Sequence, residues 1–122
     1  MTYCATAPSL TAWEKRVHVT NPALLPPQVM VAYELPDSLS SRKIGIDDLP
    51  PDWITHETHT QGLGDRWLDL AAEVLLFVPS VIAPIADALD RNVLINHRVA
   101  DTSLIKIADV TPFTLDPRLF RP

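Results

Sequence analysis

Glu14 is the first residue whose type and position could support catalysis. It lies in a predicted amphipathic helix over residues 10–17, in which Leu10, Trp13 and Val17 share one apolar stripe. Glu14 stands four residues after Leu10 and three before Val17, so its carboxylate is expected to lie on the flank of that stripe and face the interior. Such a carboxylate serves either as a partly buried ion-pair partner or as a catalytic group.

Ser80 is the second candidate, because it follows an apolar segment that is predicted to be a strand. A hydroxyl at the end of a strand can point into a cleft while the strand holds it rigidly. The alternative is a serine that caps a turn. The segment VPSVI lacks the glycines that flank the serine of a nucleophile elbow. A generic hydrolase function therefore rests on Ser80 alone.

The histidines and glycines indicate no metal site and no phosphate-binding loop. His56 and His59 have a spacing that can converge on a metal, but they lie in a predicted irregular loop without a cysteine or a third histidine nearby. His18, four residues after Glu14, could pair with that carboxylate on a helix. The chain has three glycines, too few for a P-loop or a dinucleotide fingerprint. We therefore expect neither a metal nor a cofactor.

The first half of the chain is predicted to hold short elements separated by prolines. Thr2 to Ala5 is expected to end a strand, and Pro8 suits the start of the helix that carries Glu14. Gln28 to Leu35 is rich in β-branched and aromatic residues and bounded by prolines, which indicates a strand. Trp53 is expected to anchor a proline-dense loop by burying its ring.

The second half is predicted to begin with a helix over residues 66–73, for which Asp65 is the expected N-cap. Trp67 and Leu70 would lie on the inner face of that helix. Val74 to Ile82 is apolar at both odd and even positions, which predicts a fully buried strand with elements covering both faces of its sheet. Further short strands are expected over residues 93–95, 104–107 and 113–115.

Composition limits the class of protein. A chain of 122 residues with 47% hydrophobic residues can bury one core, so one domain is expected. The formal charge of -5 and the lack of a basic stripe disfavour direct binding of nucleic acid. A single cysteine, Cys4, gives no sign of an oxidising compartment. The first residues lack the basic and apolar pattern of a signal peptide, and no run of eighteen apolar residues occurs, so the cytoplasm is the expected location.

Several short motifs occur together and in a fixed order. They are YCATAPSLTAWEKRVHV at the start, Leu49-Pro50 with Trp53, Gln61 with Gly64-Asp65 and Trp67, Val78-Pro79-Ser80, Asn92-Val93-Leu94-Ile95-Asn96, and Asp116-Pro117-Arg118-Leu119. In this combination the chain resembles the RES domain, the toxin component of bacterial RES–Xre type II toxin–antitoxin systems. The resemblance covers nearly all of residues 1–122.

The resemblance implies a fold and an activity. The fold would be a compact single α+β domain similar to ADP-ribosyltransferases, with a short twisted sheet and a few short helices. The activity would be cleavage of NAD+ at the nicotinamide–ribose bond, by hydrolysis or by phosphorolysis, with NAD+ as substrate and no cofactor. Tyr3, Ser80 and Asn96 would bind NAD+, while Glu14 and Ser80 would be catalytic.

The resemblance also implies a partner, an Xre-like antitoxin that occludes the pocket, and it allows a homodimer within that complex. Two departures from the family pattern bear on activity. Nothing corresponds to the N-terminal strand with its arginine or to the GGRWN-like segment, so the domain is expected to be N-terminally truncated. The turn after Asn96 reads His97-Arg98-Val99 without the usual prolines. The alternative function is a truncated, inactive RES remnant that retains antitoxin binding.

Overall fold

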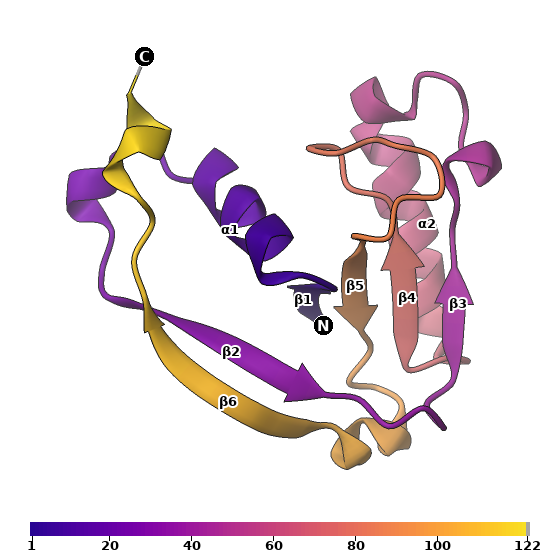
Figure 1. The fold of residues 1–122 in the computed structure, drawn as a ribbon. Coiled ribbons are helices and arrows are strands. Elements are labelled where there is room, and N and C mark those ends of the chain that lie inside the picture. Colours follow the sequence, from indigo (N-terminus) through magenta and orange to yellow (C-terminus); the bar gives the residue numbers. More distant parts are fainter. Residues whose placement is uncertain (122) are drawn as a thin grey trace.

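A four-stranded mixed sheet forms the centre of the molecule. The computed structural model describes residues 1–121, and Figure 1 shows the arrangement. The strand order is β1 (Thr2–Ala5), β5 (Asn92–Ile95), β4 (Leu75–Val78) and β3 (Ser41–Lys43). β5 runs antiparallel to both β1 and β4, whereas β3 and β4 are parallel. A parallel pair needs a crossover connection, and helix α2 (Glu57–Leu70) supplies it.

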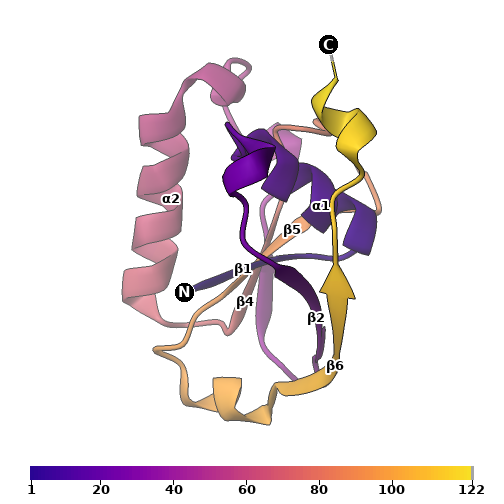
Figure 2. The same cartoon turned by 90° about the vertical axis from the view of Figure 1, so that its left-hand side faces the viewer.

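The central strands β4 and β5 are buried on both faces, as their apolar sequence predicted. On one face Trp67 of α2 packs with Leu76 and Leu94. On the other face Leu75, Val93 and Ile95 form a second cluster with Val74 and Leu39. In Figure 2 α2 lies on one side of the sheet, and α1 and the pair of strands labelled β2 and β6 lie on the other. The predicted strand is shorter than expected, because β4 ends at Val78, just before a proline that cannot donate a ladder hydrogen bond.

Helix α2 begins nine residues earlier than the sequence predicted, so the proposed N-cap role of Asp65 is wrong. Asp65 lies inside the helix, which runs from Glu57 through two glycines. Each internal glycine costs about 1 kcal/mol relative to alanine. Burial of Trp67 against the sheet offsets this cost, since its side chain is 3% exposed. Leu70, expected on the inner face, is instead exposed at the C-terminal end of the helix.

Helix α1 (Pro8–Val17) forms as predicted, but a different face is turned inward. Leu10 is buried, whereas Trp13 and Val17 are exposed and do not form the expected stripe. Glu14 is half-buried, one helical turn after Leu10. The side of α1 that faces the interior therefore carries both Leu10 and Glu14, as expected from the position of Glu14 on the flank of the apolar stripe.

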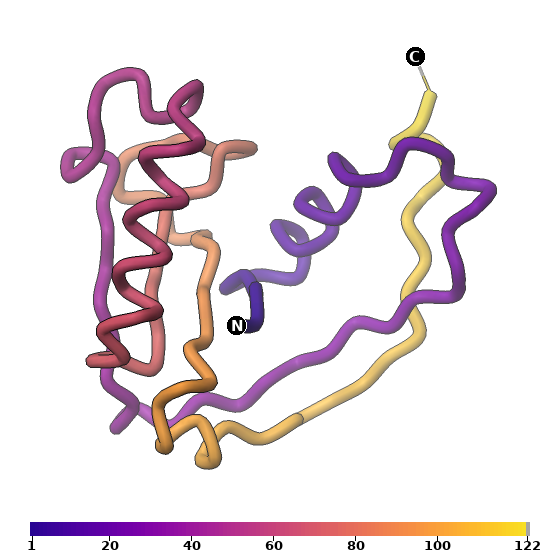
Figure 3. The backbone as a smooth tube through the Cα atoms, turned by 180° about the vertical axis from the view of Figure 1, so that it is seen from behind, coloured from indigo at the N-terminus to yellow at the C-terminus, as the bar shows by residue number. Residues whose placement is uncertain are grey.

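Two further strands form a separate antiparallel ribbon, β2 (Gln28–Glu34) with β6 (Lys106–Phe113). β2 was predicted within one residue, but β6 is one strand of eight residues where two short ones were expected. A register shift between Ala32 and Tyr33 marks a β-bulge. Figures 1 and 3 show the ribbon extending as a curved arm away from the four-stranded sheet.

The architecture confirms a compact single α+β domain with a short mixed sheet and two α-helices. Its similarity to ADP-ribosyltransferases stays a prediction. Among the described residues, no helix combines the length and the apolar character that crossing a membrane requires.

Candidate functional site

Glu14 and Ser80, the two predicted catalytic residues, are in direct contact. The Ser80 hydroxyl donates a hydrogen bond of 2.7 Å to Oε1 of Glu14. The same carboxylate oxygen accepts a second hydrogen bond, of 2.8 Å, from the side-chain amide of Asn92. These three side chains come from α1, from the segment after β4 and from the start of β5, and we call them the carboxylate cluster.

The sheet explains why distant parts of the sequence meet here. β4 and β5 are antiparallel, and Val78 at the end of β4 is paired with Asn92 at the start of β5. Ser80 follows Val78 after Pro79, so it lies beside Asn92 at the same end of the sheet. The Ser80 hydroxyl also accepts a hydrogen bond of 3.1 Å from the main-chain amide of Ile82. Ser80 is thus a turn serine, one of the two alternatives predicted for it, and its hydroxyl also donates to Glu14. Its catalytic role stays a prediction.

The C-terminal turn holds the helix that carries Glu14. Arg16 on α1 donates a hydrogen bond of 2.8 Å from its Nε to the carbonyl of Leu119, and its guanidinium lies 4.2 Å from the centre of the Phe120 ring. Asp116 caps this turn by accepting from the main-chain amide of Arg118. The Arg118 side chain lowers the pKa of the Asp116 carboxyl, so the cap is ionised at neutral pH.

A broad groove of about 820 Å³ runs along the sheet between β1, α2 and the end of α1. Its volume lies within the usual range for small-molecule sites. Asn92 of the carboxylate cluster lines it, as does Tyr3, whose side chain is 73% exposed. Tyr3 is paired with Leu94 across β1 and β5, so it lies on the same sheet face as Leu94 and Asn92. The predicted NAD-binding tyrosine and Asn92 therefore line one groove, and Glu14 is linked to it through its hydrogen bond with Asn92.

The segment from Asp47 to Ser80 builds much of the groove wall, although only Ser80 was expected to contribute to a pocket. Trp53 is buried as predicted and forms part of the floor. Glu57 and Asp65 of α2 add two carboxylates. Lysine and arginine are missing from the residues that line the groove. His18 also lines the groove, and the two carboxylates are the groups in it that suit a positively charged part of a ligand.

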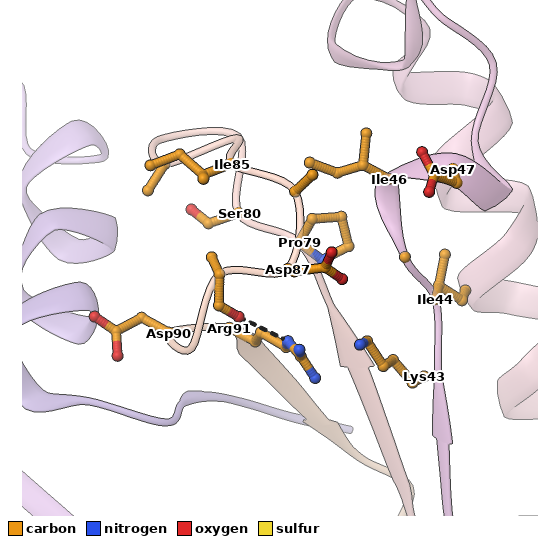
Figure 4. A pocket seen from close by; sticks show the side chains of 14 residues that line it. Lys43, Ile44, Ile46, Asp47, Pro79, Ser80, Ile85, Asp87, Asp90 and Arg91 are labelled. Atoms are coloured by element: carbon orange, nitrogen blue, oxygen red, sulfur yellow. Dashed lines mark hydrogen bonds between the residues drawn. The ribbon is translucent and has the colours of Figure 1, made fainter.

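A smaller pocket of about 40 Å³ adjoins Pro79 and Ser80. Figure 4 shows its charged residues, including Lys43, Asp87 and Arg91, and the hydrogen bond of 3.0 Å from the Arg91 Nε to the carbonyl of Ala88. In that view Ser80 points away from Lys43, toward the side on which α1 lies. The pocket is too small for a nucleotide, so the larger groove is the candidate ligand site.

Asn96, the predicted substrate-binding asparagine, lies apart from the groove. It is fully buried, with 0% exposure, at the far end of β5. Its amide donates to the carbonyl of Leu68, and its Oδ1 accepts from the main-chain amide of Arg98, each at 3.0 Å. Asn96 therefore bonds to main-chain groups in the interior, and the asparagine that contacts Glu14 is Asn92. Asn92 is the first residue of the same NVLIN motif. It stands two residues before Leu94, so both side chains lie on one face of the strand, and this spacing could have identified Asn92 from the sequence.

The histidines do not join the carboxylate cluster. His56 pairs with Asp52 at 2.9 Å, and His59 lies within α2 instead of in a loop. His97 is hydrogen-bonded to the Thr2 hydroxyl at 2.5 Å. Because Ser80 donates to a carboxylate and not to a histidine, the Ser-His-Asp arrangement of serine hydrolases is not assembled. Within residues 1–121 no group of three or more acidic, histidine or cysteine side chains could hold a metal ion.

Comparison with known proteins places this chain in a family. The model of the RES domain matches residues 1–116. A curated protein of Pseudomonas putida strain KT2440, called Toxin Res, is 35% identical over 122 aligned residues, which cover 97% of this chain and 78% of that protein. The match spans the strand with Tyr3, the helix with Glu14 and both central strands of the sheet. The chain belongs to the RES domain family.

Proposed function

We propose that this protein is a RES-type toxin that degrades NAD+ by cleaving the bond between nicotinamide and ribose. The observation that carries the proposal is the carboxylate of Glu14, held by the Ser80 hydroxyl and the Asn92 amide beside a groove of about 820 Å³. The arrangement fixes a negative charge at one place without neutralising it, because neither donor carries a positive charge.

A fixed carboxylate suits this reaction. As the C1′–N bond of NAD+ breaks, its electron pair goes to the pyridine nitrogen, nicotinamide leaves as a neutral molecule, and positive charge develops on the ribose. A preorganised negative charge stabilises that transition state more than the ground state. An oxygen of water or phosphate then bonds to C1′. With water, a proton is released to solvent and ADP-ribose forms; with phosphate, the product is ADP-ribose 1″-phosphate.

The groove offers further support for NAD+ as the ligand. The exposed ring of Tyr3 provides a surface on which a flat heteroaromatic ring can stack. The nicotinamide ring of NAD+ is a cation, and the groove carries the carboxylates of Glu57 and Asp65. In this proposal Glu14 is the catalytic residue, and Tyr3 binds the nicotinamide–ribose end. Direct contact between NAD+ and Ser80 or Asn96 stays a prediction, since Ser80 is 1% exposed and Asn96 is fully buried.

The proposal includes a biological setting. The relative from Pseudomonas putida is called a toxin. By analogy we propose that this chain acts in the cytoplasm and is neutralised by an Xre-like antitoxin that covers the groove. Ile54 and Val81 support the last point, because both line the groove, and their side chains remain exposed for an antitoxin to bury.

The test is consumption of NAD+ by the purified chain. Incubation with NAD+, with and without phosphate, should release nicotinamide, and chromatography with mass spectrometry will identify ADP-ribose or its 1″-phosphate. The Glu14→Gln variant, prepared in the same way, controls for contaminating enzymes. Undiminished NAD+ at high concentrations of folded protein under both conditions would refute the proposal.

A further inference from the structure

Asn92 has a contact that neither its sequence motif nor its family match assigns to it. Its side-chain amide donates a hydrogen bond of 2.8 Å to Oε1 of Glu14. We propose that Asn92 is a positioning residue, which orients the Glu14 carboxylate for charge stabilisation without itself forming a bond in the reaction. The inference rests on the proposed function, because the carboxylate it orients is the proposed catalytic group.

Two donors are needed to fix a carboxylate, and they come from separate segments. A single hydrogen bond from Ser80 would hold Oε1 at one distance from one donor. The second bond, from Asn92, restricts the position of Oε1 further, because donors from two separate segments meet it at 2.7 and 2.8 Å. Oε2 accepts no hydrogen bond from residues 1–121, so both observed donors act on Oε1.

The main chain of Asn92 makes it a rigid support. β5 lies inside the sheet, and Asn92 is paired with Ala5 on one side and with Val78 on the other. Side chains on an interior strand are held more precisely than side chains on a loop. Ser80, by contrast, lies after the end of β4 and depends on the amide of Ile82 for its orientation. Asn92 is thus the donor to Glu14 whose backbone is fixed by the sheet on both sides.

A double-mutant cycle distinguishes positioning from substrate contact. Asn92→Ala should lower kcat by about 10- to 100-fold, the range expected when a reacting group is displaced by up to about 1 Å, while KM changes little. Asn92→Asp keeps the shape but replaces the donor by a carboxylate that repels Glu14, so it should lower kcat at least as far. In a Glu14→Gln background, Asn92→Ala should lower the residual kcat by less than about twofold.

Asn96→Ala provides the matched control, because it removes an asparagine from the other end of the same strand. In the double variant of Asn96→Ala and Glu14→Gln, the fold-losses in kcat of the two single variants should multiply, since Asn96 makes no contact with Glu14. A raised KM for Asn92→Ala, or an effect that multiplies with that of Glu14→Gln in the same way, would overturn the positioning role. Thermal melting of each variant confirms that the rates refer to folded protein.

A second measurement separates this inference from the proposed function. If the wild-type chain does not consume NAD+, the proposed function fails, and the contact between Asn92 and Glu14 is then judged from stability alone. Urea denaturation midpoints of the wild type, Asn92→Ala, Glu14→Ala and the double variant should be non-additive, because the two residues share one hydrogen bond. Additive midpoints would show that Asn92 does not hold Glu14, whatever the catalytic result.

Discussion

The two ends of β5 carry the same residue type and have different tasks. Asn92 at the first end donates to a carboxylate beside an open groove, whereas Asn96 at the second end bonds only to main-chain groups in the interior. The side-chain amide of an asparagine can make either kind of contact equally well. The difference therefore lies in the partner: one end of the strand meets α1 and the groove, and the other meets α2 and the turn after the strand.

This contrast separates catalysis from stability within one strand. Changes to Glu14 or Asn92 at the Asn92 end should act mainly on turnover, since both side chains are only partly buried. Changes at the Asn96 end should act mainly on the free energy of unfolding, because they leave buried main-chain groups without partners. Four substitutions test the contrast.

Of the four substitutions, Glu14→Gln should have the largest effect, and it acts on turnover at the Asn92 end of β5. Glutamine keeps the shape and an oxygen that accepts from Ser80 and Asn92, but it removes the negative charge. We expect turnover of NAD+ to fall by about 10²- to 10³-fold, as when one stabilising group is lost from a transition state. The melting temperature should change little. Steady-state kinetics measures the turnover, and thermal denaturation measures the stability. A loss of stability as large as the loss of turnover would contradict the assignment of Glu14 as the catalytic residue.

Asn96→Ala should have the largest effect on stability. It removes the partners of the Leu68 carbonyl and the Arg98 amide and leaves a small cavity. We expect the free energy of unfolding to fall by about 2 to 4 kcal/mol, measured by urea denaturation. Turnover per folded molecule should fall far less than in Glu14→Gln. A large loss of turnover in a stably folded variant would show that this end of β5 also contributes to catalysis.

Cys4→Ala tests the apolar face of the sheet, opposite the face that carries Tyr3. Burial raises the pKa of the Cys4 thiol, so the folded protein retains this proton at a pH at which the unfolded chain loses it. The contribution of Cys4 to stability is therefore present below about pH 8.5 and declines as the pH rises.

Urea denaturation between pH 7 and 10 should show a shallower alkaline loss of stability for Cys4→Ala than for the wild type. Iodoacetamide should also label Cys4 more slowly in the folded protein than in urea. Equal labelling rates in both states would show that the thiol is accessible, and the two faces would then differ less than the structure indicates.

Arg98→Ala should have the smallest effect, although Arg98 is close to Asn96. Its guanidinium pairs with Asp69 at 2.7 Å, and both side chains are exposed. Exposed ion pairs contribute about 0 to 1 kcal/mol, so we expect a loss of no more than about 0.5 kcal/mol in urea denaturation at low salt. The Arg98→Ala variant keeps the main-chain amide that donates to Asn96. A loss as large as that of Asn96→Ala would mean that the side chain, and not the amide, stabilises this end.

Local patterns in the sequence were sufficient for much of the fold. The helix with Glu14, the strand over residues 28–34 and the buried central strands follow from apolar periodicity and proline positions. The start of α2 did not follow, because its two glycines and its threonines are typical of a loop. The packing of Trp67 and Leu68 against β4 and β5 favours a helix there, and this contact is tertiary. Propensity is a weak signal when one large side chain can be buried.

The candidate site was predictable in part. The flank position of Glu14 indicated an inward carboxylate, and the motif order indicated the family. The choice between Asn92 and Asn96 required the strand register, because residues four apart on a strand lie on the same face, and only neighbouring elements distinguish the ends.

The sequence by itself therefore determined the RES family, the α+β class and the choice of Glu14 and Ser80 as candidates. Tertiary structure alone decided that these two meet, that Asn92 completes the carboxylate cluster, that Tyr3 and Asn92 line one groove, and that Asn96 belongs to the interior. The physical reason is that periodicity and motifs report which side of an element a residue occupies. The partner that it meets there depends on how strands and helices from distant parts of the chain are packed together.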